Sequence, residues 1–298
     1  MTWLSDAAVG RLRDAAELPD FSGTRYDLVR ELGRGGMGVV YEAHDRELDR
    51  RVAIKVLATE TASPAAAERM RAEARVVARL EHPGIVPLHD AGTLADGRIY
   101  YAMKLVRGQR LDELACGTTE LLRILLRVCE AVALAHARGV VHCDLKPQNV
   151  MTGTFGEVLV MDWGVARTVD ESRVDANTRV LAGTRGFMAP EQERGEPVDA
   201  RADVYALGAM LRALLVAPPK LLRAIIDKAT AADRDARYAN AGELAADLVR
   251  YLDGAPLAAY RENAFERAGR WLARNRALVA VVVAYLIMRV IVLIAVHR

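Results

Sequence analysis

The change from strand-like to helix-like patterning near residue 107 restricts the fold more than any other feature of the sequence. Before it, between Tyr26 and about Val106, the stretches VVYEA, RVAIKVL and IYYAMKLV are rich in the β-branched and aromatic residues typical of strands. One helical pattern, Ser63–Leu80, interrupts them, and its Ser-Pro opening is a helix start signal. From Leu111 onward, apolar residues recur mostly at helical spacing. These patterns predict an α+β chain with two lobes, a cleft between them and a hinge at residues 106–109.

The helical part is divided into several stretches, and the chain as a whole into five segments. We expect helices within residues 111–117, 119–139, 202–216, 219–233 and 240–254. The predicted segments are an N-terminal extension with one short helix (1–24), a strand-rich lobe (25–107), a helical lobe (108–254), a basic segment (255–276) and an apolar helix (277–296).

The overall charge and the cysteines exclude several classes of protein. Among 298 residues, 41 are Lys or Arg and 39 are Asp or Glu, and this balance argues against a dedicated nucleic-acid-binding protein. The three cysteines, Cys116, Cys129 and Cys143, have no CxxC spacing and no clustered histidines. A disulfide framework or a zinc site is therefore not expected, and a reducing compartment is the simplest interpretation.

The C-terminal twenty-residue stretch Ala277–Val296 carries a single charge, Arg289. Its length matches a hydrocarbon core of roughly 30 Å at about 1.5 Å per helical residue. Arginines dominate residues 260–276, and a basic flank is expected to remain in the cytoplasm and to attract anionic headgroups. We therefore predict a single-pass anchor in the cytoplasmic membrane, with the two lobes on the cytoplasmic side. The alternatives are a buried globular helix for the apolar stretch and a solvated charged helix for the basic one.

The glycine-rich stretch LGRGGMGVVY has GxGxxG spacing at Gly33, Gly35 and Gly38. A dinucleotide-binding site would need a helix directly after the glycines, but the VVYEA that follows favours a second strand. A glycine-rich hairpin lets backbone N–H groups approach a phosphate without an intervening Cβ atom. Seventeen residues later, Lys55 lies in a predicted strand, and Glu73 on the following helix can supply its counter-charge. Taken singly, both are ordinary surface residues; after the hairpin, they become a phosphate-holding lysine and its partner.

The stretch HCDLKPQNV combines an acid, a base and an amide between two apolar segments. Phosphoryl transfer requires an acceptor for the proton of the attacking hydroxyl, metal ligands and cations for the transferred oxygens. Asp144 can serve as the acceptor, Lys146 can face the γ-phosphate and Asn149 can offer an amide oxygen to a hard cation. Asp162 follows an apolar strand and is a candidate main Mg²⁺ ligand, although in isolation a plain turn residue that ends a strand is the preferred interpretation.

Six motifs occur in a fixed order: GRGGMGVV, VAIK, HCDLKPQN, DWG, GTRGFMAPE and ADVYALG. On these motifs the chain resembles the eukaryotic-like serine/threonine protein kinases of bacteria, from about Tyr26 to Gly254. The resemblance implies a bilobal protein kinase fold that binds ATP and Mg²⁺ (or Mn²⁺) in its cleft and acts on Ser and Thr hydroxyls of proteins. It implies catalytic roles for Asp144, Lys146, Lys55 and Glu73, and metal ligands at Asn149 and Asp162. It also implies a nucleotide site with Met103 as gatekeeper, formed by Leu32, Gly33, Arg34, Gly35, Gly36, Met37, Gly38, Val40, Ala53, Lys55 and Met103.

The resemblance also implies structural roles for later residues. Glu191 is expected to pair with Arg237 and to anchor the segment that precedes it. Asp203 is expected to brace the backbone of the HCDLKPQN loop from below. Thr184 is expected to contact Asp144 and Lys146.

Three departures from the family pattern carry information. Cys143 replaces an arginine that pairs with a phosphate on the activation loop, so phosphorylation of Thr168, Ser172 or Thr178 is not expected to switch activity on. A redox-sensitive thiol at Cys143 is the alternative. Trp163 replaces a phenylalanine, and its indole N–H requires a partner. The helical lobe also lacks about twenty residues that normally follow the ADVYALG helix and help to dock protein substrates.

Two other functions remain as alternatives. A membrane-tethered pseudokinase would use the fold as a nucleotide-binding scaffold, but all five polar groups of the chemistry are present. A small-molecule kinase is disfavoured by the GTRGFMAPE segment, which positions peptides in the family. The sequence leaves open whether the chain forms a dimer, and whether Arg289 pairs with an acidic residue of a partner.

Overall fold

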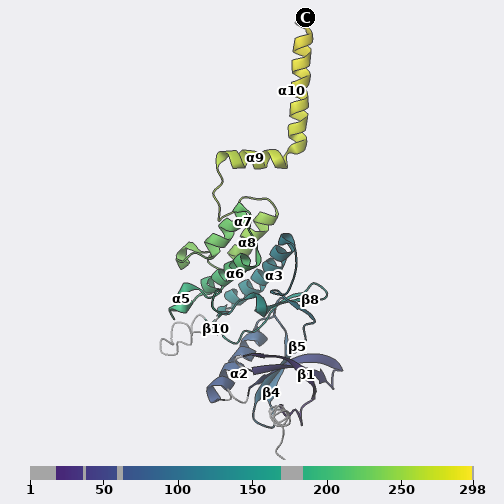
Figure 1. Cartoon of the computed structure of the whole chain (residues 1–298), viewed down its shortest axis with the longest axis vertical. Helices are drawn as coiled ribbons and strands as arrows, with labels where there is room; N and C mark the ends of the chain where they lie inside the picture. The colour runs from purple at the N-terminus through teal and green to yellow at the C-terminus, as the bar shows by residue number, and fades with distance from the viewer. Residues whose placement is uncertain (1–17, 36–37, 59–62, 169–183, 297–298) are drawn as a thin grey trace, which may run out of the picture.

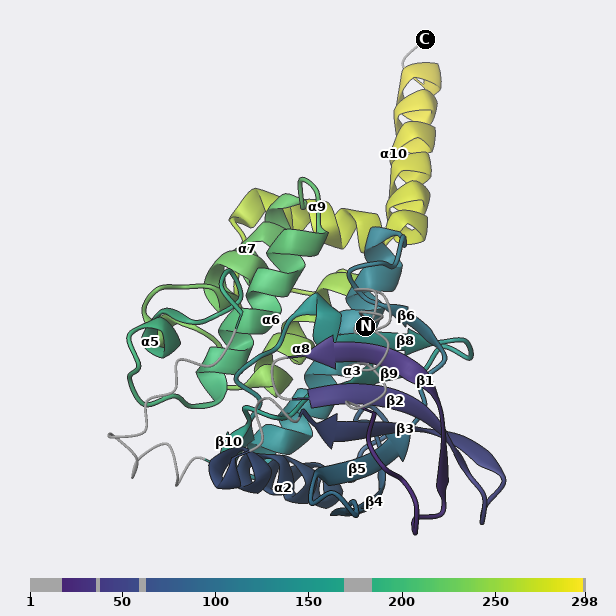
Figure 2. The ribbon, with the colours of Figure 1, turned by 60° about the horizontal axis from the view of Figure 1, so that its bottom comes forward.

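The strand-rich lobe is one antiparallel sheet with the strand order β1-β2-β3-β5-β4 (Figure 2). The computed structural model describes residues 18–35, 38–58, 63–168 and 184–296. The predicted N-terminal helix lies outside these residues. The strands are β1 (Tyr26–Gly35), β2 (Gly38–Asp45), β3 (Arg50–Leu57), β4 (Leu88–Thr93) and β5 (Ile99–Lys104).

Alternation along β3 assigns its side chains to two different apolar clusters. Val52, Ile54 and Val56 belong to a cluster on the outer face of the sheet. Ala53 and Leu57 belong to the large cluster that continues into the helical lobe. Because successive side chains of a strand point to opposite faces, Lys55 is on the same face as Ala53 and Leu57, toward the cleft.

Helix α2 (Pro64–Arg79) packs against this sheet and confirms the predicted helix start. The Ser63 side chain accepts a hydrogen bond from the backbone N–H of Ala66, and Pro64 occupies the first turn, where its missing N–H costs nothing. Met70, Glu73 and Val77 are buried on the inner face of the helix. Of these, only Glu73 carries a charge, so it must be paired.

The second lobe is mainly helical and lies beside the strand-rich lobe (Figure 1). Its helices are α3 (Thr118–Ala137), α5 (Pro190–Glu193), α6 (Ala200–Leu214), α7 (Lys220–Ala229) and α8 (Ala241–Leu252), with the 3₁₀ turns Pro147–Asn149 and Arg234–Ala236. Its short strands are β6 (Gly108–Arg110), β7 (Val140–Val141), β8 (Val150–Gly153), β9 (Val158–Val160) and β10 (Arg167–Thr168). Helix α3 is central because it contacts both α6 and α8.

One helix prediction is wrong. Residues 111–117 form a turn and extended chain, and Gly117 is the extended residue before α3. The side chain of Asp112 accepts hydrogen bonds from Arg110 and from Gln148. Seven residues are too few for a helix to be stable without strong packing. The hydrogen bonds of Asp112 therefore stabilise the turn in place of a helix.

The connection between α6 and α7 spans residues 215–219, as short as the sequence indicates. Val216 is 97% exposed within it. Ala217 has a φ of 52°, in the left-handed region that favours glycine.

Two helices follow the lobes, α9 (Ala264–Arg274) and α10 (Arg276–Val296). Figure 1 shows α9 beyond the helical lobe and α10 extending away from the rest of the molecule. Within the described part of the chain, no helix meets both the length and the apolar content needed to cross a membrane.

A buried ion pair joins α5 to the chain before α8, as expected for Glu191 and Arg237. The two guanidinium NH groups of Arg237 lie 2.6 and 2.9 Å from the carboxylate oxygens of Glu191. The remaining donors reach the backbone carbonyls of Ala231, Arg201 and Ala232. All five N–H groups of the guanidinium are therefore used, which a buried charge requires.

We predict that Arg237→Ala lowers the free energy of unfolding by roughly 3–5 kcal/mol, because it leaves the Glu191 carboxylate buried without a counter-charge. Urea denaturation at neutral pH measures this change. Arg234→Ala, on the exposed 3₁₀ turn nearby, is the matched control and should change stability by less than about 0.5 kcal/mol. Equal losses in the two variants would contradict the assigned role of the pair.

Candidate active site

A cavity of about 520 Å³ opens between the two lobes and collects polar groups from both of them. The glycine hairpin between β1 and β2 contributes to one wall, and the loop that follows β7 contributes to the opposite one. Val40 and Met103 add apolar surface. A cleft with apolar walls and a few convergent polar groups is the usual form of a small-molecule site.

Lys55 is the point at which three elements meet. Its ammonium lies 2.9 and 3.1 Å from the carboxylate oxygens of Glu73 on α2, and 3.0 Å from Oδ1 of Asp162 beyond β9. Burial alone would lower the pKa of Lys55, but the surrounding oxygens of Tyr101, Glu73 and Asp162 raise it well above its ordinary value. The side chain therefore stays positively charged in the cleft.

Asp162 lies two residues after β9, half exposed to the cavity, with a φ of 56°. Burial would raise the pKa of its carboxyl, but the charge of Lys55 and their hydrogen bond lower it below the ordinary value of 3.8. The group is therefore an anion at neutral pH. Its left-handed backbone is costly for a residue other than glycine, and such strain is typical of functional sites.

Asp144 lies across the cleft and is held from three sides. Lys146 Nζ is 2.8 Å from its Oδ2, and Thr184 donates its hydroxyl to Oδ1 at 2.9 Å. Lys146 also contacts the Thr184 hydroxyl at 2.7 Å, which confirms the expected contacts of Thr184. Asn149 donates its amide N–H to the backbone oxygen of Asp144 at 2.8 Å, so its amide oxygen can face the cavity.

Asp203 on α6 fixes the loop that carries Asp144. Its carboxylate accepts the backbone N–H groups of His142 and Cys143 at 2.8 and 2.9 Å, and His136 Nε2 is 2.8 Å away. Full burial would raise the pKa of this carboxyl, but these hydrogen bonds and the two histidines lower it. The predicted brace is therefore present, and it holds Cys143 at a φ of 66°.

Most of the predicted site residues line this one cavity. They are Gly33, Arg34, Gly35, Gly38, Val40, Lys55, Glu73, Met103, Asp144, Lys146, Asn149 and Asp162. Leu32, which is exposed, and Ala53, which is buried in the apolar cluster, are not among the lining residues. Gly36 and Met37 lie outside the described residues.

Several residues that line the cavity were not predicted, and Tyr101 and Arg110 are two polar ones among them. Tyr101 could have been found because it lies two positions before Met103 on one strand, and so on the same face. No such signal points to Arg110. It lies in a three-residue strand, β6, and pairs with Asp112.

The donor set fits a hard divalent cation held jointly with a nucleotide. Asn149 and Asp162 offer an amide and a carboxylate oxygen, the ligand types that Mg²⁺ accepts. Among the described residues, no group of three or more His, Cys, Asp or Glu side chains is placed to hold a metal ion without further ligands. This is the expected arrangement where phosphate oxygens complete the coordination.

Comparison with known proteins supplies the family. A family model for the protein kinase domain matches residues 26–242. The chain belongs to the protein kinase family. Solved kinase structures agree, since the kinase domain of Mycobacterium tuberculosis PknI is 28% identical with a TM-score of 0.60, over 77% of this chain and 96% of that one. The predicted bilobal kinase fold is therefore confirmed.

Curated relatives in the kinase family are bacterial. A probable serine/threonine-protein kinase of Streptomyces coelicolor is 36% identical over 82% of this chain and 42% of its own length. The serine/threonine-protein kinase PknB of Mycobacterium leprae is 34% identical over 80% of this chain and 44% of its own length. This chain thus spans less than half the length of these relatives.

Cys143 occupies the position at which the family pattern has an arginine. Its side chain is buried in a small apolar cluster with Val141, Ala189, Val198 and Ala202. Its backbone oxygen accepts a hydrogen bond from the Gln192 side chain at 2.9 Å. An apolar cluster in place of a guanidinium offers no cation to a phosphate.

Trp163, the second departure from the kinase pattern, is buried beside His142, with ring centroids 4.6 Å apart. Among the described residues, none accepts a hydrogen bond from its indole N–H. The ring packs as a phenylalanine would, but the partner that its N–H needs is not supplied by these residues.

We predict that phosphatase treatment changes the rate of phosphotransfer by this kinase less than about twofold, because position 143 has no arginine to pair with a phosphate on the activation loop. Activity assays before and after treatment, with mass spectrometry of the peptides that contain Thr168, Ser172 and Thr178, check this outcome. Ser172 and Thr178 lie outside the described residues. A strict requirement for phosphate would contradict the prediction.

Cys143→Ser tests the redox alternative. If the thiol of Cys143 is reactive, oxidants should inhibit the native chain and should not inhibit this variant.

Proposed function

We propose that this chain is a protein serine/threonine kinase, which transfers the γ-phosphate of ATP to hydroxyl groups of protein substrates. The observation that carries the proposal is the convergence of Lys55, Asp144, Lys146, Asn149 and Asp162 on one cavity. The names of the bacterial relatives support Ser and Thr as acceptors.

Each polar group has a separate task in this reaction. Asp144 accepts the proton of the attacking hydroxyl, and the bonds from Lys146 and Thr184 fix the direction of its carboxylate. Lys55 orients the phosphates of the nucleotide, and Lys146 is placed to face the transferred group. Asn149 and Asp162 would hold Mg²⁺, which would neutralise charge on the phosphate oxygens. Because the reaction offers little covalent work, this positioning is the main contribution of the protein.

Incubation of the whole chain with Mg²⁺ and γ-labelled ATP tests the proposal. We expect label on the chain itself or on a generic basic protein, at Ser or Thr. Asp162→Ala and Asp144→Asn should each lower transfer by at least about a hundredfold, because each removes a group needed at the transferred phosphate. Asp227→Ala, on the exposed face of α7, is the control and should retain activity.

Two results would contradict this function. Transfer that survives in Asp162→Ala would place the chemistry elsewhere. Nucleotide binding without any transfer would instead support the nucleotide-binding scaffold.

We further propose that residues 277–296 anchor the kinase in the cytoplasmic membrane, with the catalytic lobes in the cytoplasm. The support is the sequence itself, which has one charge, Arg289, in twenty residues, preceded by the arginine-rich segment. The backbone of α10 is helical over Arg276–Val296, so the apolar residues belong to one continuous element.

We predict that the chain stays with the membrane fraction after an alkaline wash. Val283→Arg combined with Leu286→Arg should release it, because each central arginine costs about 2.5–3.5 kcal/mol on insertion scales. The matched control combines Leu48→Arg with Val216→Arg, two exposed positions on the lobes, and should remain bound. Equal behaviour of the two double variants, or a wild-type chain released by the wash, would contradict anchoring by α10.

A further inference from the structure

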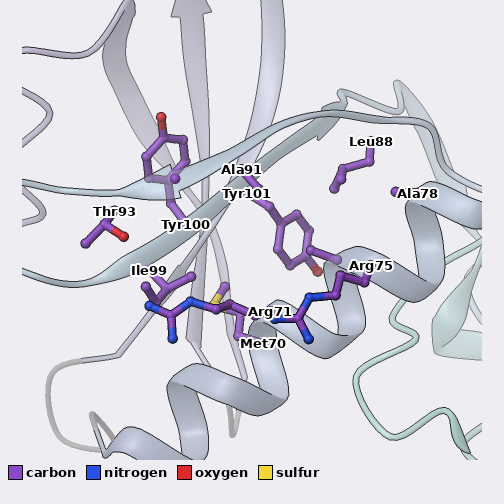
Figure 3. Close-up of a pocket in the computed structure, with 12 residues that line it drawn as sticks. Met70, Arg71, Arg75, Ala78, Leu88, Ala91, Thr93, Ile99, Tyr100 and Tyr101 are labelled. Atoms are coloured by element: carbon purple, nitrogen blue, oxygen red, sulfur yellow. The ribbon is translucent and has the colours of Figure 1, made fainter.

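Tyr101 on β5 is a buried polar residue that the reaction described above does not use. It lies directly opposite Lys55 in the pairing of β3 with β5, and only 4% of its surface is exposed. Figure 3 shows its ring reaching from the strand toward helix α2. Its hydroxyl donates a hydrogen bond to Oε1 of Glu73 at 2.8 Å.

The hydroxyl of Tyr101 is a reliable donor. Burial raises the pKa of the phenol well above its ordinary value of 10.0, and the nearby Glu73 carboxylate raises it further against the opposing effect of Lys55. The phenol therefore keeps its proton at any pH at which the protein functions. The Lys55 ammonium lies 5.7 Å from the centre of the same ring, within range of a cation–π attraction.

Glu73 thus receives hydrogen bonds from two strands of the sheet. Lys55 on β3 reaches both carboxylate oxygens, and Tyr101 on β5 reaches one of them. These bonds differ in what happens when a nucleotide binds. Lys55 must donate one or more of its N–H groups to a phosphate, whereas the Tyr101 hydroxyl can continue to donate to Glu73.

Helix α2 borders a second cavity at this place. This cavity of about 380 Å³ lies between α2 and strands β4 and β5, lined by residues such as Met70, Ala74 and Ile99 (Figure 3). Tyr101 lines both this cavity and the nucleotide cavity, and so forms part of the wall between them. Helix α2 therefore lacks van der Waals contacts with β4 and β5 along this cavity, and the bond from Tyr101 to Glu73 supplies a polar contact between the helix and the sheet.

We propose that Tyr101 is a positioning residue for phosphate binding: its hydroxyl holds Glu73, and through it Lys55, in the orientation that receives the nucleotide phosphates. This role rests on the proposed function, since it concerns the same site. Tyr101 acts through Glu73, whose carboxylate its hydroxyl contacts.

The experiment compares the affinity for Mg²⁺-ATP with the affinity for adenosine, measured by calorimetry on the whole chain in detergent. Tyr101→Phe removes the hydroxyl and keeps the ring. We expect ATP affinity to fall about tenfold, the usual effect of losing a hydrogen bond to a charged group, while adenosine affinity is unchanged. kcat/KM for ATP should fall by a similar factor.

Two further variants separate positioning from packing. Tyr100→Phe is the matched control, since Tyr100 is the neighbouring buried tyrosine and belongs to the apolar cluster on the opposite face of the sheet. It should leave both affinities unchanged. In a Glu73→Ala background the acceptor is gone, so adding Tyr101→Phe should change ATP affinity by less than about twofold.

Each outcome decides the proposal. Equal losses for ATP and adenosine, equal effects of Tyr101→Phe and Tyr100→Phe, or an undiminished effect in the Glu73→Ala background would each overturn it. A wild-type chain that binds ATP no more tightly than adenosine would also overturn it, because Lys55 would then hold no phosphate. If the expected affinity pattern appears but no phosphate is transferred, the positioning role stands and the kinase function fails.

Discussion

The ammonium of Lys55 sits between two carboxylates that come from different parts of the chain. Glu73 belongs to a helix that packs on the sheet, whereas Asp162 follows β9 of the helical lobe. A buried charge is tolerated only when it is paired and hydrogen-bonded. The buried ammonium of Lys55 therefore holds both carboxylates within hydrogen-bonding distance. Because Asp162 also faces the cavity, the contact that joins the two lobes also places an anion at the proposed metal site.

A second constraint acts on the opposite wall through the buried carboxylate of Asp203. It fixes two consecutive backbone N–H groups, at His142 and Cys143, immediately before Asp144. The backbone that leads into Asp144 is thereby fixed within the lobe, and the bonds from Lys146 and Thr184 then direct the carboxylate of Asp144. Neither constraint uses a phosphate, which agrees with the apolar surroundings of Cys143. The site is organised in advance by groups that the chain itself supplies.

Much of the fold and of the site could be predicted because the deciding signals are local. Strands β2, β3 and β5 are dense in β-branched and aromatic residues, and α2 carries its own start signal at Ser63. Lys55 and Asp162 stand out because each is a charge next to an apolar strand. Strand β4 was not predicted, since Leu88–Thr93 contains polar and small residues and is formed by pairing with β5.

What could not be predicted depends on contacts between distant residues. The hydroxyl of Tyr101 finds a partner 28 positions earlier, and within an apolar strand the residue looks like one more buried aromatic. Residues 111–117 have helical spacing, but bonds between Asp112 and its neighbours override it. The resemblance to kinases suggested Leu32 and Ala53 for the nucleotide site, yet neither lines the cavity. Leu32 is exposed, and Ala53, although it shares the cleft-facing side of β3 with Lys55, is buried in the apolar cluster.

The abrupt connection between α6 and α7 has a consequence for how this chain can change over evolutionary time. The reversal is made at the surface, with Val216 almost fully exposed, and the buried residues of both helices lie away from it. The entropy of closing a loop grows only slowly with length, by about 0.6 kcal/mol for each doubling. Residues 215–219 are therefore a point at which a whole structural unit can be gained or lost at little energetic cost, while the helix that carries Asp203 stays in place.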